Sequence, residues 1–127
     1  MATRSFIAVL RDNGYNAIYC HWDGYLDGVG KNLLNNFNTL EEVNQLIAGG
    51  DASSIDENGE VNYYQTPDSS YCFCSNYDDL IETAKNCGTE YLYVFAENQW
   101  YYQKIYGEHP RLESLAEWFE IMEPIQR

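Results

Sequence analysis

The sequence predicts an α+β fold in which three or four helices pack on a mostly antiparallel sheet built from hairpins. Short extended runs are joined by tight-turn signals, which favours antiparallel pairing of neighbouring strands. Amphipathic stretches with capping residues and terminal glycines separate these hairpins. The chain has 127 residues, a common size for one domain, so we expect residues 1–127 to form a single domain.

The first predicted element is an N-terminal hairpin. Apolar side chains occupy both alternating sets of positions from Ser5 to Arg11, and the turn signal Asp12-Asn13-Gly14 follows. The extended pattern resumes from Tyr15 to Trp22.

A glycine-rich loop follows this hairpin at residues 22–30. Its glycines predict a backbone that other residues adopt with difficulty. We expect Gly24, Gly28 or both to have positive φ, and we expect Trp22 to pack on the core.

Four segments carry helix signals, namely a capping residue, an amphipathic pattern or a terminating glycine or proline. In the last of them we expect Leu112, Leu115, Phe119 and Met122 to share the inner face. The segments are Lys31 to Phe37, Thr39-Leu40-Glu41-Glu42 to Gly49-Gly50, Ser75 or Asn76 to Gly88, and Pro110 to Pro124.

The remaining extended runs predict two more hairpins and one further strand. The resulting order is roughly ββ-α-α-ββ-α-ββ-α. The runs are Ile55 to Tyr64 around Asn58-Gly59, Tyr71 to Cys74, and Glu90 to Ala96 with Trp100 to Tyr106 around Glu97-Asn98-Gln99.

The chain is strongly acidic, with 20 Asp and Glu, seven Lys and Arg, and a net charge of −13. Both halves are negative, so the charge is not confined to an acidic tail. Because binding to nucleic acid or anionic lipid requires basic side chains, we expect neither as a partner. The charge favours a basic protein surface as partner, while solubility alone is the alternative interpretation.

Tyrosine is the second unusual feature, with 12 residues in a chain that also has five Phe and three Trp. A small domain cannot bury so many phenols, so several are expected on its surface. Tyrosine is enriched where proteins meet proteins, which favours a binding face over an active site.

Two acidic rows are the candidate partner-binding sites. Glu113, Glu117 and Glu120 share one face of the last predicted helix, away from its apolar face and without a neighbouring cation. Asp78, Asp79 and Glu82 form a weaker row at the start of an earlier helix. To these we add Tyr25, Asp27 and Tyr101 as candidate contact residues.

Catalytic chemistry is a less favoured hypothesis. A thiol or metal-dependent hydrolase would centre on Cys20, His21 and Asp23, but adjacent strand residues point to opposite faces, which separates Cys20 from His21. Asp23 and Asp27 are better explained as turn formers than as cation ligands. We expect no cofactor and no metal, and we interpret the four cysteines (Cys20, Cys72, Cys74, Cys87) as buried free thiols rather than as disulfides or a zinc site.

The strings Ala2 to Val9, Ile18-Tyr19-Cys20-His21-Trp22-Asp23-Gly24-Tyr25 and Gly28-Val29-Gly30 resemble small acidic proteins of phages and prophages. The resemblance covers mainly the first ~50 residues and carries no assigned activity. It implies an origin, and with it a place in the cytoplasm of a bacterial host. In size and charge the chain is also similar to anti-CRISPR and anti-restriction proteins, some of which imitate the charge of DNA.

The leading hypothesis is a non-enzymatic, phage-type inhibitor of a bacterial defence system. It would bind a basic, nucleic-acid-binding surface through its acidic and tyrosine side chains. An immunity-type protein that neutralises a basic toxin nuclease is the alternative within the binding class, and the hydrolase is the alternative outside it. The oligomeric state is left open.

Overall fold

The computed structural model describes residues 2–106 and 111–126. Within them, eight strands form one sheet in the order β4-β3-β2-β1-β6-β7-β8, and β5 pairs separately with β2. The strands are β1 Ser5–Arg11, β2 Gly14–Cys20, β3 Ala52–Ile55, β4 Val61–Tyr63, β5 Cys72–Cys74, β6 Tyr91–Ala96, β7 Gln99–Lys104 and β8 Glu113–Ser114. The α-helices are α1 Lys31–Asn36, α2 Leu40–Ala48, α3 Tyr77–Asn86 and α4 Leu115–Gln126, with a π-helical turn at Leu26–Gly30 and a 3₁₀ turn at Pro67–Ser69.

The three predicted hairpins are confirmed. β1 pairs with β2, β3 with β4, and β6 with β7, each antiparallel. The third hairpin turns through Glu97 and Asn98, which both have positive φ (53° and 62°) although neither is glycine. Asparagine tolerates this conformation better than most residues.

The sheet is mixed, which corrects the expectation of a sheet built from hairpins alone. β1 runs parallel to β6, and β2 runs parallel to β3 at one pair, Cys20 with Ala52. The physical reason is that β1 lies at the centre of the sheet with both faces covered. Strands buried on both faces accept parallel neighbours, and hairpin signals do not determine how one hairpin docks on the next.

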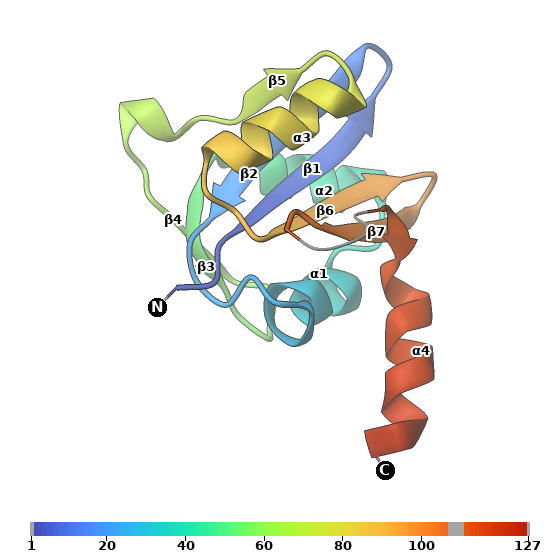
Figure 1. Ribbon diagram of the computed structural model, residues 1–127. Helices are drawn as coiled ribbons and strands as arrows, with labels where there is room; N and C mark the ends of the chain where they lie inside the picture. Colours follow the sequence, from blue (N-terminus) through green and yellow to red (C-terminus); the bar gives the residue numbers. More distant parts are fainter. Residues whose placement is uncertain (1, 107–110, 127) are drawn as a thin grey trace.

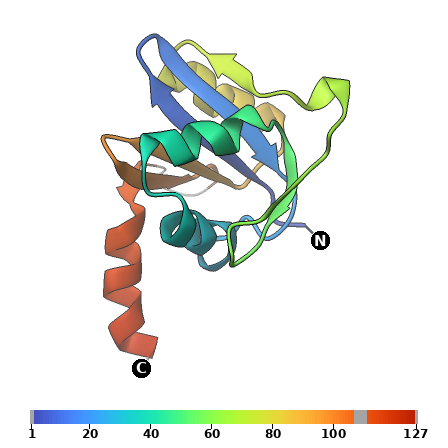
Figure 2. The ribbon, with the colours of Figure 1, turned by 180° about the vertical axis from the view of Figure 1, so that it is seen from behind.

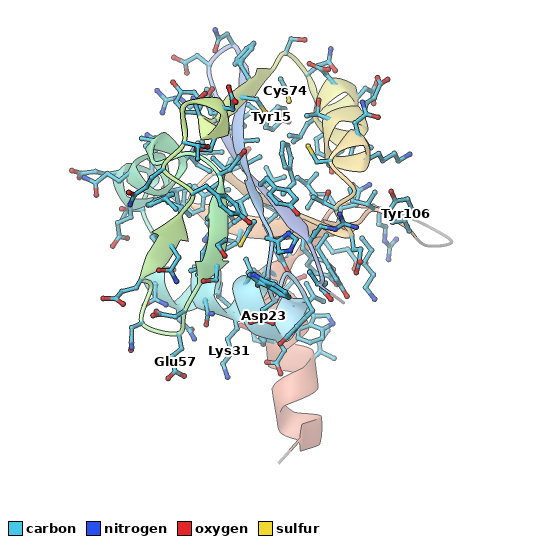
Figure 3. The ribbon with its side chains drawn as sticks, turned by 90° about the vertical axis from the view of Figure 1, so that its left-hand side faces the viewer. Tyr15, Asp23, Lys31, Glu57, Cys74 and Tyr106 are labelled. Carbon is cyan, nitrogen blue, oxygen red and sulfur yellow. The ribbon has the colours of Figure 1, made fainter. Side chains whose placement is uncertain are left out.

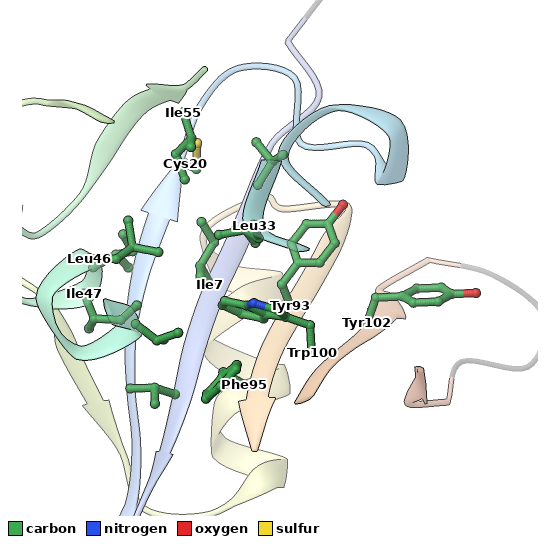
Figure 4. Packing of buried hydrophobic residues seen from close by; sticks show 14 of the residues in the cluster. Ile7, Cys20, Leu33, Leu46, Ile47, Ile55, Tyr93, Phe95, Trp100 and Tyr102 are labelled. Atoms are coloured by element: carbon green, nitrogen blue, oxygen red, sulfur yellow. The ribbon is translucent and has the colours of Figure 1, made fainter. Parts of the chain in front are cut away.

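Two helical layers cover the two faces of the sheet. Figure 1 shows α3 in front of β1 and β2, and Figure 2 shows α2 on the opposite face. Ile7 lies on the same side of the sheet as Leu46 and Ile47 of α2 (Figure 4), and Val9 belongs to the same core cluster. On the other face, a smaller cluster includes Phe6, Ala8, Leu80, Ala84 and Leu92.

The caps of the central helices are confirmed. The Glu42 N–H donates to Thr39 Oγ1 at 3.2 Å, and the Thr39 N–H donates to Glu42 Oε1 at 3.2 Å. The Asp79 N–H donates to Asn76 Oδ1 at 2.8 Å, and Asn76 thereby caps the start of α3. These side chains satisfy backbone donors that a helix leaves unpaired in its first turn.

The last helix differs from its prediction at both ends. It begins at Leu115 and runs through Pro124 to Gln126, while Pro110 lies outside the described residues. Glu113 and Ser114 instead form β8, which pairs with Tyr102 and Tyr101. This pairing satisfies backbone groups along the outer edge of β7, which outweighs the local helix signal.

Helix α4 leaves the sheet beside β7 and projects from the body of the domain (Figures 1 and 2). Of its predicted inner face, Leu115 is fully buried and Phe119 is partly buried against the core, whereas Leu112 precedes the helix and is 40% exposed. Within the part of the chain that the structure describes, no helix is long and apolar enough to span a membrane.

Candidate functional site

The glycine-rich loop and the preceding His21 form one segment, residues 21–30, which we call the motif loop. Hydrogen bonds tie this loop to the body of the domain. The Tyr93 hydroxyl donates to the Gly24 carbonyl at 2.6 Å, and the Gly24 N–H donates to the Thr3 carbonyl at 2.8 Å. Within the loop, the Val29 N–H donates to the Asp23 carbonyl at 2.8 Å. The loop ends in the π-helical turn, a rare conformation that is frequent at functional sites.

Both expectations about the backbone and tryptophan of this loop are wrong. Gly24 and Gly28 do not have positive φ; Asp23 does, at 57°. The glycines are needed instead for close approach: a Cβ on Gly24 would lie 2.8 Å from Ser5 Cβ, and one on Gly28 would overlap the Asp23 carbonyl oxygen. Trp22 is 47% exposed and does not belong to the core.

The loop presents aromatic and acidic side chains outward. The Tyr19 hydroxyl and His21 Nδ1 are 2.7 Å apart, and the His21 ring meets Trp22 edge-on with centroids 4.7 Å apart. Tyr25 is 43% exposed, and its hydroxyl donates to Asp23 Oδ1 at 3.4 Å. The Asp23 carboxylate is the main cause of the raised pKa of Tyr25.

The predicted loop contacts lie on one accessible surface. Asp27 is exposed like Tyr25. Figure 3 shows Asp23 in the lower half of the domain body, well below Tyr15 and Cys74 near the top. Tyr25 and Asp27 are therefore accessible to a partner, and they stand apart from the acidic residues of α3.

The predicted row Glu113, Glu117 and Glu120 is split by the boundary between β8 and α4. Glu113 lies in the strand, where it accepts a hydrogen bond from the Tyr102 hydroxyl at 2.8 Å and forms an ion pair with Arg111 at 3.1 Å. These two contacts hold the pKa of Glu113 below its ordinary value. The expectation of a helical row without a neighbouring cation is therefore wrong for Glu113, while Glu117 and Glu120 lie exposed on α4.

A groove of about 590 Å³ lies at the base of α4. Tyr101 from β7, one of the predicted contact residues, lines it together with Glu113 and Glu117. Sequence reasoning missed Trp118 and Ile121, which also line this groove. Their spacing of three residues was a usable signal, because residues at i and i+3 share a helix face.

The acidic row of α3 divides into structural and free members. Asp79 Oδ2 accepts a hydrogen bond from the Ser75 N–H at 3.1 Å, which gives this carboxylate a role in starting the helix. Asp78 and Glu82 are exposed. Only these two are available as candidate contacts.

The geometry does not assemble a nucleophilic site around Cys20. Its thiol is buried and contacts the carbonyls of Trp22 and Ser53 at 3.9 Å, while His21 bonds to Tyr19. Burial raises the pKa of Cys20 to about 12, so at neutral pH it is a thiol rather than a nucleophilic thiolate.

The cysteines are free, as expected, but they are not all buried: Cys20 and Cys74 are buried, Cys72 is half-buried and Cys87 is exposed. Burial also raises the pKa of Cys72 to about 12. Among the described residues, no group of three or more His, Cys, Asp or Glu side chains is placed to hold a metal ion. His109 lies outside those residues.

Comparison of the chain with protein-family models, with curated proteins and with solved structures finds no match.

Proposed function

We propose that this protein is a non-catalytic inhibitor that binds a basic protein surface through α4 and the groove at its base. The observation that carries the proposal is the combination of a projecting helix, exposed apolar side chains and carboxylates in one place. Ile121 is 65% exposed, and it borders the same groove as Trp118 and Glu117.

The apolar part of this surface supports binding to a protein. A helix that packs only on its own domain normally turns its large apolar residues inward. In α4, Trp118 packs partly against the core while Ile121 is exposed, and both line the groove together with Tyr101 of the sheet. Aromatic residues set in a groove are typical anchors of protein interfaces.

The charges of α4 support a basic partner. Glu117 and Glu120 are exposed, and neither forms an ion pair with another described residue. The ion pair that the described residues do form joins Arg111 to Glu113. Carboxylates on a molecule of net charge −13 attract a basic surface and repel an acidic one. Charge of this sign therefore favours one class of partner before any contact forms.

In its narrower form, the proposal is that the partner is a nucleic-acid-binding protein of a bacterial defence system. The surface that such a protein offers to DNA or RNA is basic, so an acidic helix competes with nucleic acid for it. The resemblance of the Ile18–Tyr25 string to phage and prophage proteins supports this form.

The test measures how well a phage plates on bacteria that carry a CRISPR or restriction system and express the protein. We expect the wild-type protein to restore plating on at least one system in a panel. The double variant Glu117→Gln/Glu120→Gln should lose this protection, because it removes two charges while keeping side-chain size and helix propensity. Its free energy of unfolding should stay within about 0.5 kcal/mol of wild type.

The matched control is Asp78→Asn/Glu82→Gln on α3, which removes two exposed charges outside the groove. Glu113 and Asp79 are left unchanged because each has a structural hydrogen bond. The control should retain protection, whereas Ile121→Ala should weaken it. Equal, slight losses from both double variants would contradict a docking role for α4, and failure of wild type on every system would contradict the defence target.

The salt dependence of binding separates the electrostatic contribution to partner recognition from the apolar contribution. A pull-down from bacterial lysate at low salt identifies the captured protein, and its association rate is then measured at rising salt. We expect the association rate to fall steeply, since screening weakens attraction between exposed charges. An association rate that does not change with salt would contradict recognition by carboxylates.

A further inference from the structure

A second hollow, distinct from the groove at the base of α4, gathers basic side chains. It has a volume of about 530 Å³ and lies where β1 and β6 begin and β7 ends. Among the described residues, six line it: Arg4, Gly88, Glu90, Tyr91, Lys104 and Tyr106. Two of the seven basic residues of a strongly acidic chain thus meet in one place.

Arg4 is held at this hollow by its surroundings. A Cβ on Gly88 would lie 3.3 Å from one terminal nitrogen of Arg4 and 3.4 Å from its Cζ, so the guanidinium lies directly over this glycine. Gly88 has φ of +72°, which ends α3 and brings its backbone under the arginine. Arg4 Nε is buried and has no hydrogen-bond partner among the described residues. Because this atom is shielded from solvent, a ligand in the hollow would have to meet the terminal nitrogens of the guanidinium.

The other side chains at the hollow provide a second cation, two aromatic rings and a carboxylate. Lys104 is exposed and supplies a second positive charge. Tyr91 is half-buried, and Tyr106 is 61% exposed at the rim (Figure 3). Glu90 places one carboxylate among these groups. Two cations suit a phosphate, tyrosine rings suit a planar base, and a carboxylate accepts hydrogen bonds from sugar hydroxyls.

We propose that this hollow binds a nucleoside monophosphate, with the phosphate between Arg4 and Lys104 and the base against Tyr91 or Tyr106. Its volume falls within the range of small-molecule sites. The ligand is a free nucleotide rather than a nucleic acid, because the further phosphates of a polymer would lie against a surface of net negative charge. The inference does not depend on the function proposed for α4.

The experiment is a titration of the ¹⁵N-labelled protein with adenosine monophosphate, followed by amide chemical shifts. We expect saturable shifts centred on Tyr91, Lys104 and Tyr106. Lys104→Gln should weaken binding about tenfold, as expected for loss of a charged hydrogen bond to phosphate. Lys31→Gln is the matched control, since it removes an exposed lysine on α1, outside the hollow, and it should bind like wild type.

Further titrations measure the contributions of the phosphate and of the nucleoside separately. Inorganic phosphate and adenosine should each bind more weakly than adenosine monophosphate at the same residues. Arg4→Lys keeps the charge but loses the forked donor set, so it should bind more weakly than wild type while remaining folded. The Glu117→Gln/Glu120→Gln variant should bind the nucleotide normally.

Two outcomes would overturn the proposal. One is the absence of saturable shifts at millimolar nucleotide. The other is equal weakening by Lys104→Gln and Lys31→Gln, which would show a diffuse charge effect and not a site.

Discussion

Tyr93 links the sheet to the motif loop through a hydroxyl that is completely buried. Its partner, the Gly24 carbonyl, lies 69 residues away in the sequence. The sequence places Tyr93 in a strand, but neither its face nor this partner follows from local pattern. Tyr93 therefore has a structural role and is not one of the surface tyrosines that a partner could contact.

The change Tyr93→Phe should destabilise the protein by about 1–3 kcal/mol, because it leaves the buried Gly24 carbonyl without a donor. Urea unfolding measures the difference. Tyr106→Phe, at a position that is 61% exposed, is the control and should leave the unfolding midpoint unchanged. Equal midpoints for Tyr93→Phe and wild type would show that water replaces the lost donor.

Trp22 and Trp100 offer a direct comparison of an exposed and a buried indole. Trp100 is 2% exposed, and its Nε1 donates to the Phe37 carbonyl at 2.7 Å. Trp100→Ala should cost about 3–5 kcal/mol, whereas Trp22→Ala should cost on the order of 1–2 kcal/mol and leave a folded domain. Thermal unfolding of both variants checks this order, and unfolding of Trp22→Ala at room temperature would contradict it.

At the scale of elements, the hairpins and capped helices are predictable because their signals are local. The Thr39–Glu42 capping box and the turn at Asn58-Gly59 involve residues within a few positions of one another. The boundary between β8 and α4 is not predictable in this way. It depends on pairing with the edge of β7, and no capping or turn signal near Glu113 encodes that pairing.

The motif loop is an element whose glycines are explained by space rather than by φ. Gly24→Ala and Gly28→Ala should each destabilise the fold by about 1–3 kcal/mol, because the added methyl group meets neighbouring atoms at too short a distance. Asn35→Ala on the exposed side of α1 is the control and should have little effect. Chemical denaturation compares the three variants, and an unaffected Gly28→Ala would mean that the loop relaxes freely.

At the scale of the whole molecule, buried thiol and phenol groups with raised pKa make the free energy of unfolding fall at alkaline pH. Burial raises the pKa of Cys20 from 9.0 to about 12 and raises that of Tyr93 well above 10.0. The folded state therefore keeps protons that the unfolded chain releases. The resulting stability is present in full below about pH 9 and is lost as pH rises toward the folded-state pKa values.

We expect the free energy of unfolding to fall between about pH 9 and pH 11, by about 1.4 kcal/mol per pH unit for each proton of difference. Urea unfolding at several pH values measures this slope. Cys20→Ala lacks one of the groups and should show a shallower decline than wild type. A free energy that stays flat or rises over this range would contradict the assignment.

The sequence by itself determined the three hairpins, the capped starts of α2 and α3, and the acidic net charge. These properties depend on neighbouring residues and on composition. Only the tertiary structure decided that β1 pairs parallel to β6, that α4 projects beside a groove, and that Arg4 and Lys104 line one hollow. Parallel pairing requires burial on both faces of β1, and each of these surfaces joins residues far apart in sequence, so no local pattern could encode them.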